Sequence, residues 1–258
     1  MTPPVLCYHR IGGPLELGVT RVSQAVFTRQ MESLAAAGWR TLSLAEFADP
    51  RPTSHAPRRF LLTFDDGYAS LAERAYPVLE GLGFTATTFV ITDFVGRHNT
   101  WDVQYTWRRL RHLDWPEIER WQARGFSFAS HGARHRRLTW VDDVTAADEL
   151  GRARQALVDR LGADAGRAIA YPFGAVDERA ERLAGQAGYE LGFGGVGGGR
   201  GGDHSSALNR RRVPVYMWDA GDTPFGLRDD GLGSVGRFVA HVANRCAVGT
   251  SLMLKLAR

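Results

Sequence analysis

Short apolar runs alternate along the chain with longer segments in which apolar residues recur every three or four positions. Short runs of this kind predict buried strands, and the wider spacing predicts amphipathic helices. The predicted strands are 5–8, 60–63, 87–91, 126–129, 168–171, 189–193 and 213–216. The predicted helices are 23–37, 68–82, 116–123, 142–161 and 177–187.

Local signals support several of these boundaries. Ser23 is a good N-cap for the first predicted helix, and Gly38 follows its end. Pro77 stands inside predicted helix 68–82 and is expected to kink it. Because strands alternate with helices, we predict a parallel α/β sheet, open or closed into a barrel. The length of 258 residues suits a single α/β barrel, so we expect one domain over 1–258.

Composition narrows the class of protein. Apolar residues make up 44% of the chain and charged residues 23%, with a formal net charge of +4, as in ordinary soluble enzymes. No basic run is interleaved with aromatic residues, so a nucleic-acid-binding role rests on the charge alone. The glycine-rich segment 194–206 matches neither a dinucleotide fingerprint nor a P-loop, and predicts a flexible surface loop.

Targeting signals are not visible in the sequence. The N-terminal residues lack a basic segment followed by a long apolar one, and no apolar run could cross a bilayer. We therefore expect a cytoplasmic protein by default, with export left open. Cys7 lies in an apolar run and predicts a small buried residue, while a bridge to Cys246 stays possible.

Polar residues stand at the carboxyl ends of the predicted strands. Asp65 and Asp66 close one apolar run, His131 follows another, and His9 follows the first. The active sites of α/β barrels are built at that edge of the sheet, so these side chains should converge there.

One carboxylate and two imidazoles are enough to hold a catalytic zinc-type ion, and a second carboxylate can activate water. His131 and His135 stand four apart, with no glutamate after the first, unlike the metalloprotease helix. Taken separately, Asp65 and Asp66 could be an N-cap and a solvated turn, and the histidines could be a solvated pair in an arginine-rich loop. The combination predicts a metal-dependent hydrolase.

The motifs as a set resemble the polysaccharide deacetylase family, carbohydrate esterase family 4. The matching segments, in order, are Thr63–Tyr68, Ser130–His135, Tyr171–Gly174 and Arg212–Val215. The resemblance implies a distorted (β/α) barrel of about seven parallel strands and one divalent metal ion, zinc before cobalt or nickel. It also implies hydrolysis of an N-acetyl or O-acetyl group on a sugar.

The resemblance also implies roles for individual residues. Asp66, His131 and His135 would hold the metal. Asp65 would be the general base that takes a proton from the attacking water. The backbone N–H of Phe173 would help to stabilise the oxyanion.

At two positions the chain departs from the family pattern, so the roles usually found there are expected of other residues. Ala170 stands where many members have an arginine that steadies the base, so Arg212 is expected to orient Asp65. The C-terminal segment 251–256 lacks the histidine that is the acid in many members. The segment Leu6–Arg10 is similar to the subgroup acting on β-1,6-linked N-acetylglucosamine polymers, which makes His9 the candidate general acid. A structural role for His9 at the strand end is the alternative.

Aromatic side chains suit sugar rings, and Tyr171 and Trp218 are the expected substrate contacts. Core packing is favoured for the tryptophans before the histidine motif, Trp101 among them. The remaining histidines, including His112, are expected to take no part in the site.

The leading hypothesis is a metal-dependent deacetylase acting on an N-acetylglucosamine-containing glycan, with a carbohydrate substrate and no nucleic-acid partner. Two alternatives stay open. One is a related metal hydrolase acting on an O-acetyl ester or a small amide. The other is a non-catalytic glycan-binding barrel. The sequence predicts no oligomeric state.

Overall fold

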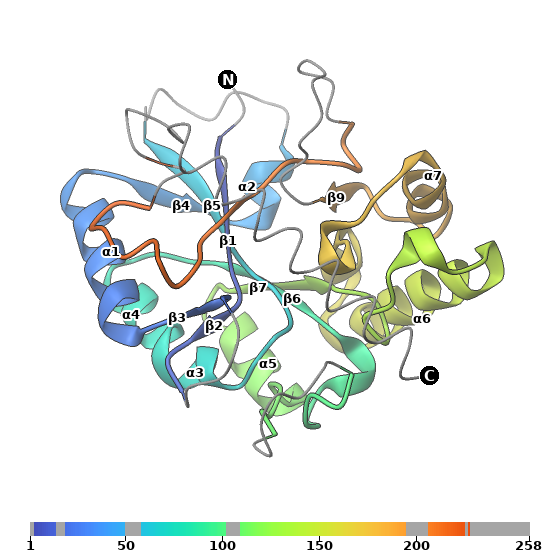
Figure 1. Ribbon diagram of the computed structural model, residues 1–258, viewed down its shortest axis with the longest axis horizontal. Coiled ribbons are helices and arrows are strands. Elements are labelled where there is room, and N and C mark those ends of the chain that lie inside the picture. The colour runs from blue at the N-terminus through green and yellow to red at the C-terminus, as the bar shows by residue number, and fades with distance from the viewer. Residues whose placement is uncertain are drawn as a thin grey trace.

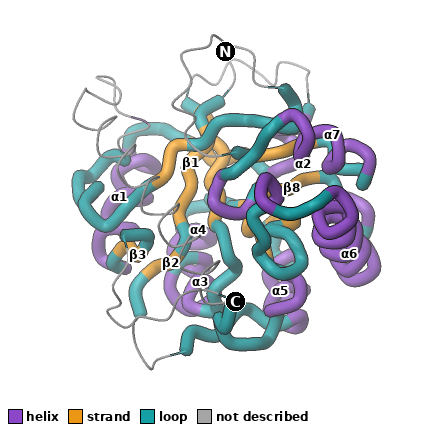
Figure 2. Tube along the Cα trace, turned by 45° about the vertical axis from the view of Figure 1, so that its right-hand side comes forward, coloured by secondary structure: helices purple, strands orange, loops and turns teal. Residues whose placement is uncertain are grey.

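The computed structural model describes residues 3–13, 19–49, 58–101, 109–194, 206–224 and 227. A curled parallel sheet forms its centre, with α1 at its left and α6 and α7 at its right in Figure 1, all packed against its outer face (Figures 1 and 2). Seven strands follow the order β10-β1-β5-β6-β7-β8-β9, and β4 pairs with the first half of β5. The strands of this sheet are β1 (Val5–Tyr8), β4 (Arg40–Leu42), β5 (Arg59–Phe64), β6 (Thr87–Val90), β7 (Ser127–Ser130), β8 (Ala168–Ala170), β9 (Leu191–Phe193) and β10 (Val213–Pro214).

The predicted parallel α/β barrel is therefore confirmed as a curled, open one. A small second sheet pairs β2 (Arg10–Ile11) with β3 (Arg21–Val22). The α-helices are α1 (Gln24–Ala36), α2 (Leu44–Ala48), α3 (Ser70–Arg74), α4 (Tyr76–Gly81), α5 (Trp115–Gln122), α6 (Asp143–Leu161) and α7 (Glu178–Gln186). Short 3-10 turns are η1 (Thr92–Phe94), η2 (Leu138–Trp140), η3 (Ala163–Gly166) and η4 (Pro172–Gly174). No described helix is long and apolar enough to cross a membrane.

The predicted helix 68–82 was wrong in its continuity, because the structure has two short helices, α3 and α4. Pro77 stands in the first turn of α4, where a missing N–H leaves no hydrogen bond unmade. Ser23, by contrast, caps α1 as expected and accepts a hydrogen bond from the Val26 N–H at 3.2 Å. The strand β4 and the helix α2 were not predicted, because they are only three and five residues long.

Alternation of side chains along β5 separates two hydrophobic clusters. Phe60, Leu62 and Phe64 point outward into a cluster that includes residues of α1 and α4. Leu61 points inward, where it joins apolar residues of β6, β8 and β9 in the barrel interior. Since successive side chains of a strand alternate between faces, Asp65 continues the inward series.

The same alternation applies to the neighbouring strands. In β1, Val5 belongs to the interior cluster, so Cys7 and His9 continue its inward series. In β7, Ala129 is interior and His131 follows two residues later. Because side chains alternate along each strand, the candidate residues point to the inside of the barrel at the carboxyl edge of the sheet.

The gap between β9 and β1 is spanned by the segment 206–214. The Gly192 N–H donates to the Ala207 carbonyl at 2.9 Å, and the Arg210 N–H donates to the Gly192 carbonyl at 2.7 Å. Further along this segment, Val213 pairs with Leu6 of β1. One short stretch of chain therefore links the last strand of the sheet path back to the first.

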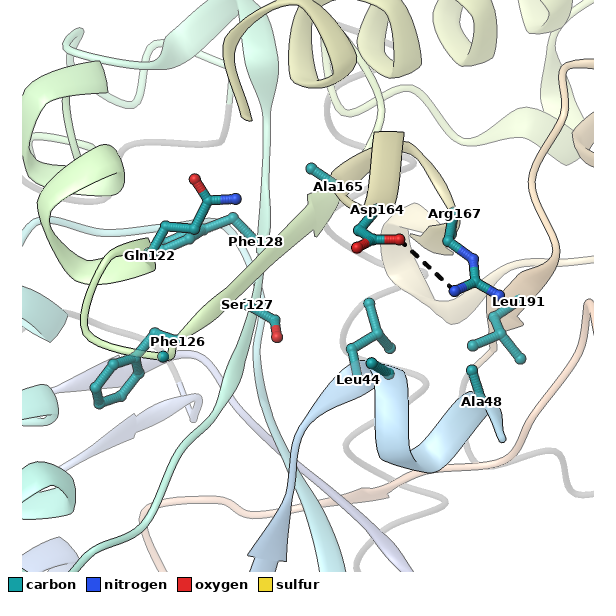
Figure 3. Close-up of a pocket in the computed structure, with 12 residues that line it drawn as sticks. Leu44, Ala48, Gln122, Phe126, Ser127, Phe128, Asp164, Ala165, Arg167 and Leu191 are labelled. Atoms are coloured by element: carbon teal, nitrogen blue, oxygen red, sulfur yellow. Dashed lines mark ion pairs between the residues drawn. The ribbon is translucent and has the colours of Figure 1, made fainter. Parts of the chain in front are cut away.

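A cavity of about 200 Å³ lies at the amino ends of β7 and β9, between α2 and the turn η3 (Figure 3). Leu44, Phe128 and Leu191 contribute apolar walls, and Arg167 pairs with Asp164 at 3.7 Å on its polar side. The candidate residues stand at the other ends of these strands, so this cavity is separate from them. The predicted surface loop 194–206 (apart from residues 194 and 206) and the C-terminal segment 251–256 lie outside the described residues.

Candidate metal and catalytic site

The turn after β5 places the two aspartates. The Asp65 N–H donates to the Tyr8 carbonyl at 3.0 Å, which continues the β1–β5 pairing by one residue. Asp66 and Gly67 then have φ angles of +68° and +69°, so the chain turns sharply in the left-handed region. A Cβ on Gly67 would lie 2.8 Å from Val90 Cγ1, which explains the glycine. The turn sets the carboxylate of Asp66 beside the histidine loop.

His131 and His135 face Asp66 from a loop rather than from a helix. His131 Nδ1 lies 2.7 Å from the Ala170 carbonyl, and because a carbonyl only accepts, Nδ1 carries the proton. The Nε2 of His131 is 3.4 Å from Asp66 Oδ1, and the Nε2 of His135 is 3.6 Å from the same oxygen. His135 has a φ of +59°, a second non-glycine residue in the left-handed region.

Glu149 of α6 holds this histidine loop, a role that was not predicted from the sequence. Its fully buried carboxylate accepts hydrogen bonds from the Arg134 N–H at 2.7 Å and from Arg134 Nε at 2.6 Å. Arg136 Nε lies 3.4 Å from the same carboxylate. A glutamate inside a predicted helix gives no sequence signal for this contact.

The residues present fit a zinc-type divalent ion. The two Nε2 atoms are 3.2 Å apart, so the three ligand atoms of Asp66, His131 and His135 are separated by 3.2, 3.4 and 3.6 Å. Bonds of about 2.0–2.1 Å to a tetrahedral centre place ligand atoms roughly 3.3 Å apart. Two imidazole nitrogens and one carboxylate oxygen are also a usual donor set for zinc.

The electrostatics of the same cluster favour positive charge. Burial opposes it, but the carboxylates of Asp65 and Asp66 raise the pKa of His131 above its ordinary value. Burial and the neighbouring His131 lower the pKa of His135 to about 3, so His135 keeps a free lone pair. The carboxylates therefore favour one positive charge in the cluster, either a proton on His131 or a metal ion in its place.

Asp65 is in a different environment, because Arg212 binds both of its oxygens. Arg212 Nη1 and Nη2 donate to Asp65 Oδ1 and Oδ2 at 2.6 and 2.7 Å, and both side chains are 5% exposed. Burial alone would raise the pKa of Asp65, but the guanidinium of Arg212 outweighs it and holds that pKa well below its usual range. Asp65 is thus an ionised carboxylate 4.0 Å from the Nε2 of His131.

Cys7, His9 and Asp65 form a second cluster of possible ligand atoms, all within 4.8 Å of one another. A metal is disfavoured there because Arg212 already occupies both oxygens of Asp65. Burial raises the pKa of Cys7, whose thiol donates to Asp65 Oδ2 at 3.5 Å. The cluster instead shows that His9 lies beside the candidate base, and its buried Nδ1 has no hydrogen-bond partner among the described residues.

The structure brings Phe173 to the site but not the side chain of Tyr171. Phe173 has a φ of +60°, and its ring centroid is 4.5 Å from that of His135. Tyr171 is fully buried in a cluster with residues of α6 and α7, on the outer face of the sheet. The expected substrate contact through Tyr171 is therefore corrected: its parity along β8 directs it away from the interior.

Trp218 lies just beyond β10, whose neighbour is β1, and therefore near the carboxyl edge of the sheet. Its side chain is 40% exposed, and its ring centroid lies 5.0 Å from that of Tyr216. This placement is compatible with contact to a sugar ring.

His112 lies beside the site, contrary to expectation, whereas Trp101 is packed in the core as expected and also contacts the site. His112 Nδ1 lies 2.7 Å from the Asp66 carbonyl, and the Trp101 ring centroid is 4.0 Å from that of His135. Their only sequence signal was a cluster of aromatic residues before the histidine motif, which favoured core packing.

Comparison with known proteins agrees with this geometry. A family model described as polysaccharide deacetylase matches residues 53–192. The chain is 29% identical over 220 residues to a putative polysaccharide deacetylase, YxkH, of Bacillus subtilis (strain 168), covering 83% of this chain and 72% of the relative.

Two further relatives extend the comparison. Over 182 residues the chain is 25% identical to a poly-β-1,6-N-acetyl-D-glucosamine N-deacetylase of Staphylococcus aureus (strain N315), covering 67% of this chain and 60% of the relative. The solved structure of IcaB from Ammonifex degensii superposes with a TM-score of 0.67 at 25% identity, covering 94% of this chain and 97% of that one.

Proposed function

Because this chain belongs to the polysaccharide deacetylase family and is a carbohydrate deacetylase, we propose that it removes N-acetyl groups from an N-acetylglucosamine-containing glycan. The similarity to a poly-β-1,6-N-acetyl-D-glucosamine N-deacetylase favours a β-1,6-linked polymer as substrate. One observation carries the proposal. One ligand atom each of Asp66, His131 and His135 lie within 4.8 Å of one another. Both oxygens of the adjacent Asp65 are instead hydrogen-bonded to Arg212.

Asp66, His131 and His135 would hold one divalent ion, zinc by its donor set. When bound, such an ion polarises the acetyl carbonyl and makes water a stronger acid. Asp65 is ionised and held in place by Arg212, and it would take the proton of the attacking water. Each carboxylate oxygen has two acceptor sites, so the bonds to Arg212 leave Asp65 able to accept this proton.

His9 would return a proton to the leaving amine. It lies in the same cluster as Asp65, and its ring is only partly buried, so it borders both the base and the solvent side. The backbone N–H of Phe173 would stabilise the negative charge that develops on the acetyl oxygen. Trp218, exposed beyond β10, would stack on a sugar ring next to the scissile amide.

Acetate release tests the proposal directly. The panel contains β-1,6- and β-1,4-linked N-acetylglucosamine oligomers, an O-acetylated xylan and a small acetylated amide, each with added zinc, cobalt or nickel. We expect the β-1,6 oligomer to be the best substrate. Faster release from the xylan would select the O-acetyl alternative, and no release by metal-loaded protein would select the glycan-binding one.

Two variants separate the aspartate roles within this assay. Asp65→Asn should keep the metal and lose turnover, whereas Asp66→Asn should lose both. If Asp65→Asn also lost the metal, the two roles would have to be exchanged.

A further inference from the structure

We propose that His112 and Trp101 are positioning residues that fix the ligands Asp66 and His135 in their metal-binding conformation. The inference rests on the proposed metal site and deepens it. Neither side chain supplies a ligand atom to that site; each acts on a ligand residue through a contact of its own.

The protonation of His112 follows from its two partners. The Nε1–H of Trp101 lies 3.0 Å from His112 Nε2, and because an indole nitrogen only donates, Nε2 must accept. The proton of the neutral ring is therefore on Nδ1, which donates to the Asp66 carbonyl at 2.7 Å. Burial lowers the pKa of His112, in keeping with a neutral ring. Trp101 thus selects the one tautomer that can hold Asp66.

The hydrogen bond from His112 is made to a residue in a strained turn. Asp66 has a φ of +68°, and its conformation persists only if surrounding contacts fix it. On either side of the His112 bond, the Ala69 N–H donates to the Arg111 carbonyl at 2.9 Å and the Leu113 N–H donates to the Gly67 carbonyl at 2.8 Å. The segment 111–113 is therefore bonded along the whole turn that carries Asp66.

Trp101 acts on the second strained ligand. Its ring centroid is 4.0 Å from that of His135, and Phe173 contacts the same imidazole with centroids 4.5 Å apart. His135 has a φ of +59°, and its Nδ1 is buried without a hydrogen-bond partner among the described residues, so ring contacts orient it. Because Trp101 is bonded to His112, one continuous set of contacts joins the conformations of Asp66 and His135.

A ligand held in place before binding loses less conformational entropy when the metal arrives, and outer-shell partners commonly raise metal affinity about 10–100-fold. The test is titration of metal-free protein with Co²⁺, followed by its visible absorption. His112→Leu removes the donor, whereas His112→Asn keeps an N–H near the position of Nδ1. We expect Co²⁺ to bind about 10–100-fold more weakly to His112→Leu, with an altered spectrum, and the asparagine variant to recover most of the affinity.

Two further variants complete the design. Trp101→Phe keeps a ring beside His135 but removes the donor that selects the tautomer, so its Co²⁺ affinity should also fall. His98→Asn changes an exposed histidine of the same loop and should bind Co²⁺ as the unchanged protein does.

Equal Co²⁺ affinity and spectrum in folded His112→Leu would overturn the proposal, as would an asparagine variant as weak as the leucine one. If His112→Leu does not fold, unchanged binding by Trp101→Phe overturns it instead. Acetate release is not part of the readout. Unchanged protein that binds Co²⁺ without releasing acetate would refute the proposed function and leave this inference standing.

Discussion

Replacement of Arg212 by methionine should destabilise the protein in a pH-dependent way, because it leaves Asp65 buried and charged. The two charge-assisted hydrogen bonds of 2.6 and 2.7 Å would be lost. Among the described residues, the thiol of Cys7, at 3.5 Å, would be the remaining side-chain hydrogen-bond donor to Asp65, and it is a weak one. Removal of one partner of a buried ion pair costs about 3–5 kcal/mol, which sets the expected loss in free energy of unfolding near neutral pH.

The sign of the pH dependence follows from the pKa of Asp65. In the unchanged protein this pKa is below the ordinary 3.8, so its stabilisation is present above that value and is lost as the pH falls through the folded-state pKa. In Arg212→Met, burial is no longer outweighed and the pKa of Asp65 rises, so stability is lost as the pH rises from about 4 through the new value. The difference between the two proteins should therefore be smallest at the lowest pH, widen as the pH rises from the folded-state pKa of Asp65 in the unchanged protein to the raised pKa in the variant, and stay constant above that value. A loss of 3–5 kcal/mol corresponds to a relative shift of about 2–4 pKa units.

Urea unfolding at several pH values, with EDTA to remove bound metal, measures this difference. Asp65→Asn combined with Arg212→Met is the control, because a neutral amide does not need the guanidinium; the double variant should recover most of the lost stability near pH 8. A destabilisation that is equal at all pH values, or that the asparagine does not relieve, would refute the reasoning.

Three other changes have defined outcomes. Gly67→Ala should cost about 1–3 kcal/mol in thermal unfolding, because its Cβ would lie 2.8 Å from Val90 Cγ1 at a φ of +69°; an unchanged melting temperature would contradict this. Glu149→Gln should weaken Co²⁺ binding and lower stability by about 1.5–3 kcal/mol, since it removes the charge that holds the Arg134 N–H and guanidinium; equal binding and stability would show that the loop does not depend on it. His9→Ala should lower kcat about 10²–10⁴-fold with unchanged Co²⁺ affinity, and a near-normal rate would leave His9 with a structural role alone.

Most of the fold could be predicted because its elements depend on local pattern. The apolar run of β5 and the Ser23 cap of α1 are signals contained in a few neighbouring residues. The division of helix 68–82 was harder, since Pro77 is compatible both with a kink and with a new first turn. Elements as short as β4 and α2 have too few residues to show a period.

The site, like the fold, could be predicted only in part. Asp65, Asp66, His131 and His135 follow strands, so their convergence could be expected from the parallel topology. The contacts of Glu149, His112 and Trp101 join residues that are distant in sequence, and no local pattern records them. The prediction for Tyr171 was wrong for a simpler reason. Tyr171 ends a predicted strand, but side-chain alternation along that strand points it to the outer face of the sheet.

Arg212, which pairs with the proposed base Asp65, comes late in the chain. Asp66, His131 and His135 have all been synthesised by residue 135, whereas Arg212 belongs to the segment that links β9 back to β1. A growing chain therefore contains all three proposed metal ligands well before it contains the partner of Asp65. The pairing of Asp65 with Arg212 can form only once the segment that joins the sheet across its gap is present. Asp65 therefore gains its partner only in a chain that contains both the first strand of the sheet and the segment that follows the last one.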